Sequence, residues 1–247
     1  MTAPSVLFID IETAPNLGWV WGRWEQNVID VKTHWYMLSF AWKWQGDKRT
    51  KCLALPDYPL AYRQNKENDK ILLGSLWSLL DAADVVIAHN GDAFDLKKTA
   101  ARLLFHKIAP PSPFKTFDTL KAARRFFKMD SNRLDDLGAY LGVGRKLPHT
   151  GKHLWFDCMK GKPAAWRKMK QYNRHDVELL ERVYDRLKPW ATNHPNISIY
   201  DDRIGIVCPT CRSDDIIKRG VYWAKSLRYQ QWTCKACGHW FHGERIK

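Results

Sequence analysis

Several features that mark whole classes of protein are missing from this sequence. It has no long uninterrupted hydrophobic run, because the most apolar region, residues 71–90, contains Asp81 and Asp84. The N-terminus lacks the basic segment and apolar core of a signal peptide. Cysteine is scarce, with six among 247 residues, and without a secretion signal it does not indicate a disulfide scaffold. We therefore expect a soluble, intracellular, cytoplasmic protein with no membrane partner.

Basic residues, in contrast, are abundant and unevenly distributed. The formal net charge is +14. Residues 1–120 hold 14 Lys and Arg against 13 Asp and Glu, whereas residues 121–174 hold 14 against 4 and residues 201–247 hold 9 against 5. A concentrated positive charge favours a polyanionic partner, since neutralising phosphates releases counterions. The distribution indicates a nucleic acid.

The stretch that best indicates chemistry is an apolar strand at residues 5–13, which ends in Asp10 and Glu12. Alternate side chains of a strand point to opposite faces, so the two carboxylates lie side by side. Carboxylate oxygens are preferred ligands of Mg²⁺ and Mn²⁺. Taken alone, the pair favours the simpler interpretation, a strand that ends at solvent and exposes two acids.

The following residues predict further strands and then alternating helices and strands. We interpret residues 17–27, which contain Trp19, Trp21 and Trp24, as an irregular loop whose indoles cap a core or stack on bases. Residues 34–45 and 50–55 form a hairpin in this interpretation. The other expected elements are helices at 66–80, 92–106, 117–128, 134–141 and 163–187, with a possible break near Asn173, and a strand at 84–89. This order predicts an α/β domain with a mixed sheet flanked by helices over residues 1–190.

Two further segments supply acids. Asp95 lies about one turn into a predicted helix that follows a buried strand, and Phe94 precedes it. Tyr172 and Asp176 are four residues apart, so they share one face of the last long helix. Four carboxylates from three distant segments could neutralise two divalent ions that no single motif could hold.

In this order the motifs resemble the signature of the DEDD exonuclease superfamily, in its tyrosine-bearing DEDDy branch. They are Asp10-x-Glu12, Asn90-x-x-x-Phe94-Asp95 and Tyr172-x-x-x-Asp176. The likeness is to the proofreading exonuclease domain of family B DNA polymerases and its stand-alone relatives, over residues 5 to about 188. The histidine-bearing branch would need His at position 171, where this chain has Gln171.

The resemblance implies a ribonuclease H-like fold and two-metal-ion catalysis with two Mg²⁺ or Mn²⁺ ions. Asp10 would bridge both ions, and Glu12, Asp95 and Asp176 would complete their ligand sets directly or through water. Tyr172 would orient the attacking water, because a phenol with an unperturbed pKa of ~10 is a weak base at neutral pH. The implied reaction is the release of 5′-mononucleotides from a 3′ end.

Substrate-binding residues are expected on both sides of the acidic site. The resemblance implies that Asn90 and Phe94 hold the terminal nucleotide. The basic segment between the second and third motifs would bind the strand that leads to the site, with Lys152 as a candidate phosphate contact. Our substrate-binding candidates there are Arg124, Arg125, Lys152, Arg167 and Lys168, and the other basic residues are Lys128, Arg145, Lys146 and Lys170.

Four of the six cysteines form two pairs, Cys208-x-x-Cys211 and Cys234-x-x-Cys237. Four thiolates at this spacing are typical of one structural Zn²⁺ in a zinc ribbon. We expect a linker over residues 191–202 and a ribbon over 203–247, with Trp232, Trp240 and Phe241 in its small core. Zinc ribbons bind DNA, RNA or protein, so a protein partner through the ribbon stays open.

The leading hypothesis is a metal-dependent 3′–5′ exonuclease that hydrolyses DNA, preferably at single-stranded 3′ ends. An RNA exonuclease and a structure-specific endonuclease are the nearest alternatives. A nucleic-acid-binding zinc-ribbon protein without catalytic activity is the alternative from a different class.

Overall fold

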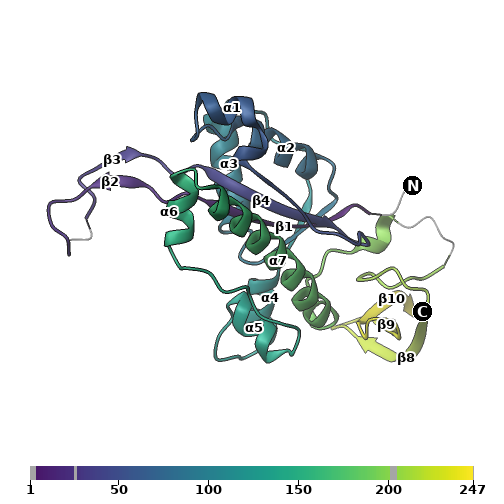
Figure 1. Ribbon diagram of the computed structural model, residues 1–247. Helices are drawn as coiled ribbons and strands as arrows, with labels where there is room; N and C mark the ends of the chain where they lie inside the picture. The colour runs from purple at the N-terminus through teal and green to yellow at the C-terminus, as the bar shows by residue number, and fades with distance from the viewer. Residues whose placement is uncertain (1–3, 25–26, 201–204, 247) are drawn as a thin grey trace.

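The computed structural model describes residues 4–24, 27–200 and 205–246, and its centre is a mixed five-stranded sheet (Figure 1). The strand order is β5-β4-β1-β6-β7. The bounds are β1 (Val6–Thr13), β4 (Met37–Trp44), β5 (Lys51–Ala54), β6 (Val85–Ala88) and β7 (Lys115–Asp118). β1 pairs antiparallel with β4 and parallel with β6. The opening strand is therefore the central strand of the sheet.

β1 is apolar on both faces in its first half and acidic in its second half. Phe8 contributes to one core cluster, whereas Leu7 and Ile9 contribute to the other, and all three are fully buried. A strand buried on both faces needs helices above and below it. Exposure begins at Asp10, so the acids come where the cover of the sheet opens.

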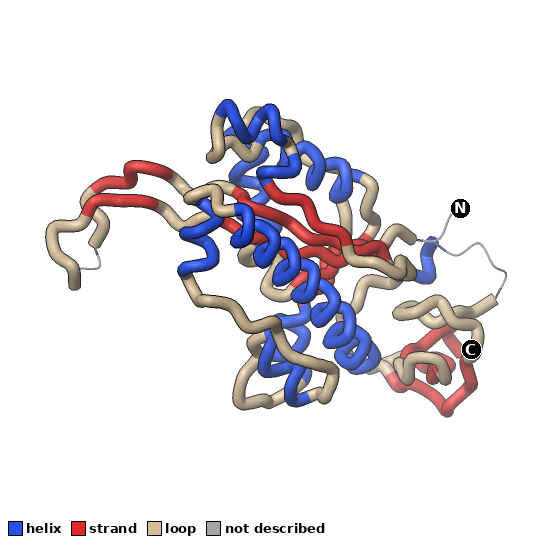
Figure 2. Tube along the Cα trace, in the orientation of Figure 1, coloured by secondary structure: helices blue, strands red, loops and turns tan. Residues whose placement is uncertain are grey.

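Helices cover both faces of the sheet, as the sequence predicts (Figures 1 and 2). Their bounds are α1 (Pro59–Gln64), α2 (Lys70–Asp81), α3 (Asp95–Phe105), α4 (Thr119–Phe126), α5 (Leu134–Tyr140), α6 (His153–Met159) and α7 (Pro163–Leu187). Apolar residues of α2, α3 and α6 pack in one core cluster, and those of α4 and α5 pack in the other. α7 contributes its first half to one cluster and its second half to the other.

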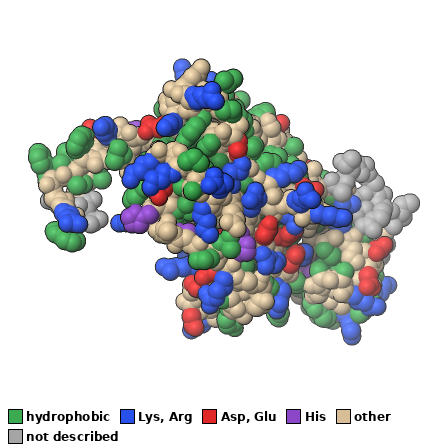
Figure 3. All heavy atoms as spheres, in the orientation of Figure 1, with side chains coloured by type: hydrophobic (Ala, Val, Ile, Leu, Met, Phe, Trp, Pro, Cys, Tyr) green, Lys and Arg blue, Asp and Glu red, His purple; other side chains and the backbone are tan. Residues whose placement is uncertain are grey.

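The prediction of an irregular loop at residues 17–27 is wrong. β2 (Leu17–Trp19) and β3 (Asp30–Thr33) pair antiparallel and form an arm that projects from the body (Figure 1). Hydrophobic side chains cover much of this arm in Figure 3. Trp21 and Trp24 are both 86% exposed, so they cap no core. Residues 25–26 of the predicted loop lie outside the described residues.

Three other elements differ from the sequence-based expectation. α1, α6 and β7 are short and were not predicted. β7 pairs in parallel with β6, and this partner explains a four-residue strand that has little signal of its own. Asp118 accepts hydrogen bonds from Leu120 N and Lys121 N as the N-cap of α4, in agreement with the helix start predicted there. α7 continues unbroken through Asn173.

Residues 205–246 form a small separate sheet, which we call the four-cysteine module. Its strands are β8 (Ile216–Trp223), β9 (Arg228–Cys234) and β10 (Trp240–Ile246), in the order β10-β9-β8. The module lies beside the C-terminal end of α7, where His239 Nδ1 is 2.9 Å from Pro189 O. Trp240, expected in the module's core, is instead 51% exposed.

The linker between the two parts is packed rather than extended. Ile197 is buried in the core cluster of the body, and its backbone N–H donates to Pro209 O of the module at 2.8 Å. Residues 201–204, where the linker was expected to meet the ribbon, are not among the described residues. Within the ranges that the structure describes, no helix combines the length and hydrophobicity needed to cross a membrane.

Candidate active site

Three carboxylates meet where β1 passes beneath α7. Asp10 and Glu12 lie on the same face of β1, and Asp176 lies in the middle of α7. One oxygen of each lies within 4.8 Å of the other two. The strand and the helix are fixed by the two core clusters, so this arrangement rests on the rigid part of the molecule. The spacing suits a divalent cation with oxygen ligands.

Asp95 lies beside this group but outside it. It is the first residue of α3 and is buried, and its Oδ1 accepts a hydrogen bond from Ile11 N at 3.0 Å. This bond fixes the start of α3 against the backbone between Asp10 and Glu12. The structure therefore brings all four predicted acids to one strand end, with three of them in direct reach of a common ion.

The four acids are held in a state that favours a bound cation. Burial, together with the charges of Asp176 and Glu12, raises the pKa of Asp10 well above its ordinary value. Burial, with the charge of Asp176, raises the pKa of Glu12 to about 8, and burial raises the pKa of Asp95 to about 7. Divalent cations offset such repulsion among buried carboxylates.

A second observation also fits a metal at this site. Asp176 Oδ1 is buried and has no hydrogen-bond partner among the described residues. An acceptor left in this way costs free energy unless a cation or water binds to it. The donor set is made only of carboxylate oxygens, which matches Mg²⁺ or Mn²⁺ rather than a softer ion. The residues present therefore fit the metal ions that the motifs imply.

Lys146 supplies a positive charge inside the site. Its Nζ donates to Asp176 Oδ2 at 2.6 Å and to the Tyr172 hydroxyl oxygen at 3.2 Å. Burial alone would lower the pKa of Lys146, but the charges of Asp176 and Asp10 raise it overall. The sequence placed Lys146 in the basic segment but did not predict this contact. The contact arises because the loop between α5 and α6 folds back over the acids.

The Tyr172 side chain is fixed in position and stays protonated. Burial, followed by the charge of Asp176, raises the pKa of its phenol above the ordinary value. Its ring lies edge-on to the His149 and Trp155 rings, with centroid distances of 4.9 and 6.0 Å. A phenol held in this way orients other groups by hydrogen bonding instead of taking a proton.

Two side chains that sequence reasoning missed hold the metal-binding candidates in place. Asn173 Nδ2 donates to Asp10 Oδ2 at 2.5 Å and to Asp10 O at 3.1 Å, and Ser39 Oγ donates to Asn173 Oδ1 at 3.0 Å. Trp155 Nε1 donates to Glu12 Oε2 at 2.9 Å. The sequence feature that could have identified Asn173 is a polar residue on the buried face of a helix. The position of Trp155, in contrast, depends on α6, which was not predicted.

Two cavities flank the acidic group. The first, of about 660 Å³, is lined by Asn90, Arg124 and Lys146 with residues 130–135. The second, of about 620 Å³, is mostly apolar and is lined by Trp35, Trp155 and Phe156 with Lys98 and Lys152. Each has the size and the basic residues to accept a nucleotide. The predicted residues Asn90, Arg124 and Lys152 thus lie beside the acids, in two different cavities.

The other predicted binding residues are more scattered. Phe94 precedes α3, is 38% exposed and has Lys98 Nζ 5.4 Å from its ring centroid. Arg125 lies exposed in the last turn of α4. Arg167 lines a third cavity, next to Asp57 and Tyr62, on another side of α7. Lys168 lies next to it on α7, half-buried. The roles of these residues stay predictions.

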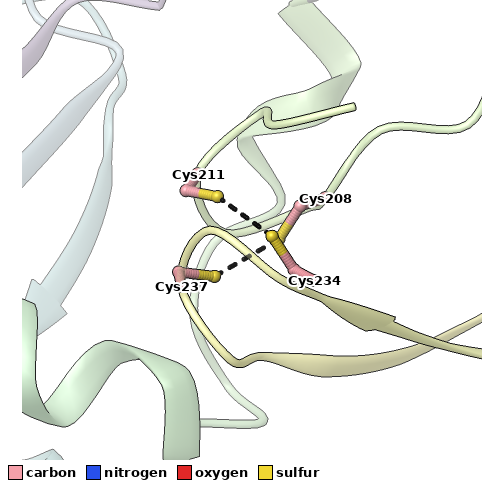
Figure 4. A group of neighbouring side chains, drawn as sticks. All are labelled: Cys208, Cys211, Cys234 and Cys237. Carbon is pink, nitrogen blue, oxygen red and sulfur yellow. Dashed lines mark hydrogen bonds between the residues drawn. The ribbon is translucent and has the colours of Figure 1, made fainter. Parts of the chain in front are cut away.

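The four predicted zinc ligands come together in the module. Cys208, Cys211, Cys234 and Cys237 each place a sulfur within 4.8 Å of the others, and the sulfurs point toward a common centre (Figure 4). Cys208 and Cys234 are buried, and none of the four forms a disulfide. The arrangement fits one tetrahedral metal ion.

A mixed sheet with carboxylates on its central strand and on a helix that crosses it defines the RNase H-like fold. The family model of the RNase H superfamily matches residues 7–188, and the chain belongs to this superfamily. Among solved structures, the chain is similar to the family B DNA polymerase from the hyperthermophilic archaeon Pyrobaculum calidifontis. The sequence identity is 16% and the TM-score 0.56, and the match covers 76% of this chain and 25% of that chain.

This chain therefore spans about a quarter of the polymerase, and at this identity the likeness concerns the fold alone. No curated protein matches the sequence. Membership of the superfamily indicates a nuclease-type function, and the acidic group is a candidate site for a divalent metal ion.

Proposed function

We propose that the protein is a metal-dependent 3′–5′ exonuclease of the DEDDy type that hydrolyses DNA from single-stranded 3′ ends and releases 5′-mononucleotides. The observation that carries the proposal is the convergence of Asp10, Glu12 and Asp176, with Asp95 bonded to the same strand and Tyr172 bonded to Lys146. The order of these residues in the chain matches the resemblance found in the sequence. The match to a family B DNA polymerase supports the same assignment.

In this proposal two Mg²⁺ or Mn²⁺ ions are held by Asp10, Glu12, Asp95 and Asp176. When bound, the ions would activate a water molecule and stabilise the charge on the departing 3′ oxygen. Asn173 and Trp155 hold Asp10 and Glu12 in orientation through the hydrogen bonds described above. Tyr172 orients the attacking water.

Lys146 has two roles in the proposal. In the absence of metal it neutralises part of the charge of Asp176, to which it is bonded at 2.6 Å. With nucleic acid bound, its ammonium group lies at the boundary of the acidic group and the cavity that contains Asn90, where it can bind a phosphate of the substrate. The apolar cavity beside Trp155 is proposed to accept the terminal base by stacking.

The module is proposed to hold one Zn²⁺ through its four cysteines. Its three short strands enclose few buried apolar side chains, and a small sheet of this kind depends on the metal for its stability. The ion would have no part in the hydrolysis, because all four of its positions are filled by protein ligands.

The experiment that tests the proposal is digestion of DNA and RNA oligonucleotides of one sequence, labelled at the 3′ or the 5′ end, with Mg²⁺ or without it. We expect early release of a labelled mononucleotide only from 3′-labelled DNA, and only with Mg²⁺. Faster digestion of RNA would identify an RNA exonuclease. Cleavage of circular single-stranded DNA would identify an endonuclease, and binding without cleavage would leave a catalytically silent binding protein.

A further inference from the structure

We propose that β8 and the turn that follows it form a second binding site for single-stranded nucleic acid, along the edge of the module's sheet and toward the end away from the four cysteines. The position of the bound strand, several nucleotides before the end that is hydrolysed, rests on the proposed exonuclease function. The binding itself does not. Three properties of the module carry the proposal, namely its charge, its exposed aromatic rings and its connection to the active site.

The charge of this part of the module has one sign. Residues 216–243 contain five Lys and Arg and no Asp or Glu. The basic residues are Lys218, Arg219, Lys225, Arg228 and Lys235. All five are exposed, and Lys235 lies near Asp215 with its Nζ 3.7 Å from the carboxylate. Among the residues that the structure describes, Lys218, Arg219 and Lys225 form no ion pair, so their charge is available to a polyanion.

Aromatic rings are exposed between these cations. Trp223 is 69% exposed and Tyr222 is 42% exposed, and as consecutive residues at the end of β8 they lie on the two opposite faces of this edge strand. The Tyr222 ring is held in place by stacking on His242, with a centroid distance of 4.6 Å and an interplanar angle of 9°. Trp223 pairs across the ladder with Arg228, whose guanidinium lies 5.8 Å from the indole centroid. Rings fixed in this way and flanked by cations suit stacking on unpaired bases.

The same features favour nucleic acid over a protein partner. Protein–protein interfaces are depleted of lysine at their centre and combine their aromatic residues with apolar neighbours. Here Lys218 lies on the same strand as the rings and Lys225 follows that strand by two residues, and β8 from Lys218 to Trp223 is exposed throughout. β8 is an edge strand, so a strand of nucleic acid can lie along it without displacing another element.

Basic and aromatic residues also lie between the C-terminal end of α7, beside the module, and the acids of the body. Trp190, which follows α7, is 66% exposed, and its ring lies 5.9 Å from the ring of Phe127 at the end of α4. α4 carries Arg124 and Arg125 in its last turn. Arg124 also lines the cavity that contains Asn90 and Lys146. In Figure 1, the end of α4 and the module lie toward the same end of α7.

The separation sets the length of nucleic acid that can reach both sites. From Asp176 to Leu187, α7 rises about 16 Å, and the module begins beyond that point. At about 3.4 Å per nucleotide of stacked strand, this distance corresponds to roughly five nucleotides. An oligonucleotide of five nucleotides bound at the acids therefore ends before it reaches β8, whereas one of 25 can contact both sites at once.

The test is fluorescence anisotropy with 5′-fluorescein oligo-dT of 5 and 25 nucleotides. The full chain carries Asp10→Asn, so that the probe is not digested and no chelator is needed that would remove zinc. We expect Trp223→Ala to weaken binding of the 25-mer about tenfold and to leave the 5-mer unchanged. Arg219→Glu with Lys225→Glu should also reduce the slope of log affinity against log salt by about 1.4, since two phosphate contacts are lost.

Two matched variants keep the test specific. Trp240→Ala removes an indole of similar exposure from β10, at the other edge of the same sheet, and Lys70→Glu reverses a charge on α2; both should bind as the parent does. Lys225→Glu alone lies in the turn between β8 and β9 and tests the site without risk to the fold. One retained zinc per chain checks that each variant module is folded.

The outcomes are distinct. Unchanged binding of the 25-mer by the Trp223 and Lys225 variants overturns the proposal, and a protein that binds the parent but not these variants would then identify the face as a protein interface. If the wild-type chain digests no nucleic acid, the exonuclease proposal fails, but the anisotropy experiment still decides whether β8 binds the strand.

Discussion

The two metal-binding groups of this molecule differ in what holds them together. The carboxylates project from β1, α3 and α7, which are fixed by two large core clusters, so the body brings four repelling acids together without a metal. The cysteines lie in a module with three short strands and an exposed Trp240, where few apolar contacts fix the elements that carry the ligands. Metal in the body serves chemistry, and metal in the module serves folding. Four predictions can break or sharpen this contrast.

The largest expected effect is on activity. Asp10→Asn removes a charged ligand but keeps an oxygen that can accept the hydrogen bond of Asn173 Nδ2. We expect Mg²⁺-dependent hydrolysis to fall by roughly 10³-fold or more, which corresponds to about 4 kcal/mol of transition-state stabilisation.

The same variant should fold normally. Because one of the mutually repelling charges is gone, its melting temperature without divalent ions should equal or exceed that of the wild type. Single-turnover digestion and thermal unfolding measure the two effects. A variant that loses stability as well as activity would show that Asp10 has a structural role and would remove one half of the contrast.

The second prediction concerns the module. Cys208→Ser removes one of four sulfur ligands, so we expect the module to unfold while the body stays intact. Neither core cluster of the described chain includes a residue beyond Ile197, so the body does not depend on the module. Limited trypsin digestion should cut within residues 205–246, which contain several exposed Lys and Arg, and leave a resistant fragment of the body.

The matched control is Cys158→Ser, which changes a buried cysteine of the body that belongs to no metal-binding group among the described residues. It should leave the trypsin pattern of the module unchanged. Equal resistance of Cys208→Ser and wild-type protein would mean that the module folds without metal.

The contrast also explains what sequence reasoning could find. Functional side chains within one strand, helix or turn are spaced by the geometry of that element, so Asp10 with Glu12, Tyr172 with Asp176 and the two cysteine pairs were evident from the sequence. The mixed sheet followed from the order of apolar segments, and the structure confirms it. These features depend on residues that are near one another in the chain.

Features that depend on tertiary contacts were missed. Asn173 contacts Asp10, 163 positions away, and Trp155 contacts Glu12 from a helix of seven residues with little periodic signal. The arm was interpreted as a loop because its strands have only three and four residues and bury almost none of their side chains. No local pattern distinguishes such strands from an irregular segment.

The third prediction compares two neighbours of Asp176. Tyr172→Phe removes the hydroxyl that would orient water, and we expect activity to fall roughly 10- to 100-fold with an unchanged Mg²⁺ requirement. Lys146→Met removes the ammonium group that lies 2.6 Å from Asp176 Oδ2. Its activity should also fall, but half-maximal activity should need less Mg²⁺, because a competing cation has left the site.

Titration of activity with Mg²⁺ separates the two variants. Arg145→Met is the control for Lys146→Met, since Arg145 is the preceding residue and pairs at the surface with Asp135. If Lys146→Met and Tyr172→Phe shared one Mg²⁺ profile, Lys146 would not compete with the metal.

The smallest expected effect is on stability and depends on pH. Without divalent ions the folded-state pKa values of Glu12 and Asp95 are raised to about 8 and about 7, from 4.5 and 3.8. A carboxyl group whose pKa is raised in the folded state stabilises that state fully at any pH below its unfolded-state pKa. This contribution is lost as the pH rises through its folded-state pKa. The pKa values of His89 and His194 are lowered to about 4 by burial, so their opposing contribution is complete by about pH 6.5.

Between pH 6.5 and 8.5 the carboxylates therefore determine how stability changes with pH. The free energy of unfolding should fall by about 2 kcal/mol as the pH rises, which lowers the melting temperature by about 4–8 °C. Saturating Mg²⁺ should remove most of this decrease, because the ions bind the ionised carboxylates of the folded state alone. Asp10→Asn should reduce it, since the variant no longer has the carboxyl group of Asp10, whose own pKa is raised in the folded state. Thermal unfolding across this pH range, with zinc kept bound throughout, tests the prediction. A melting temperature that does not change with pH in the absence of Mg²⁺ would show that the buried carboxylates do not destabilise the folded body when they ionise.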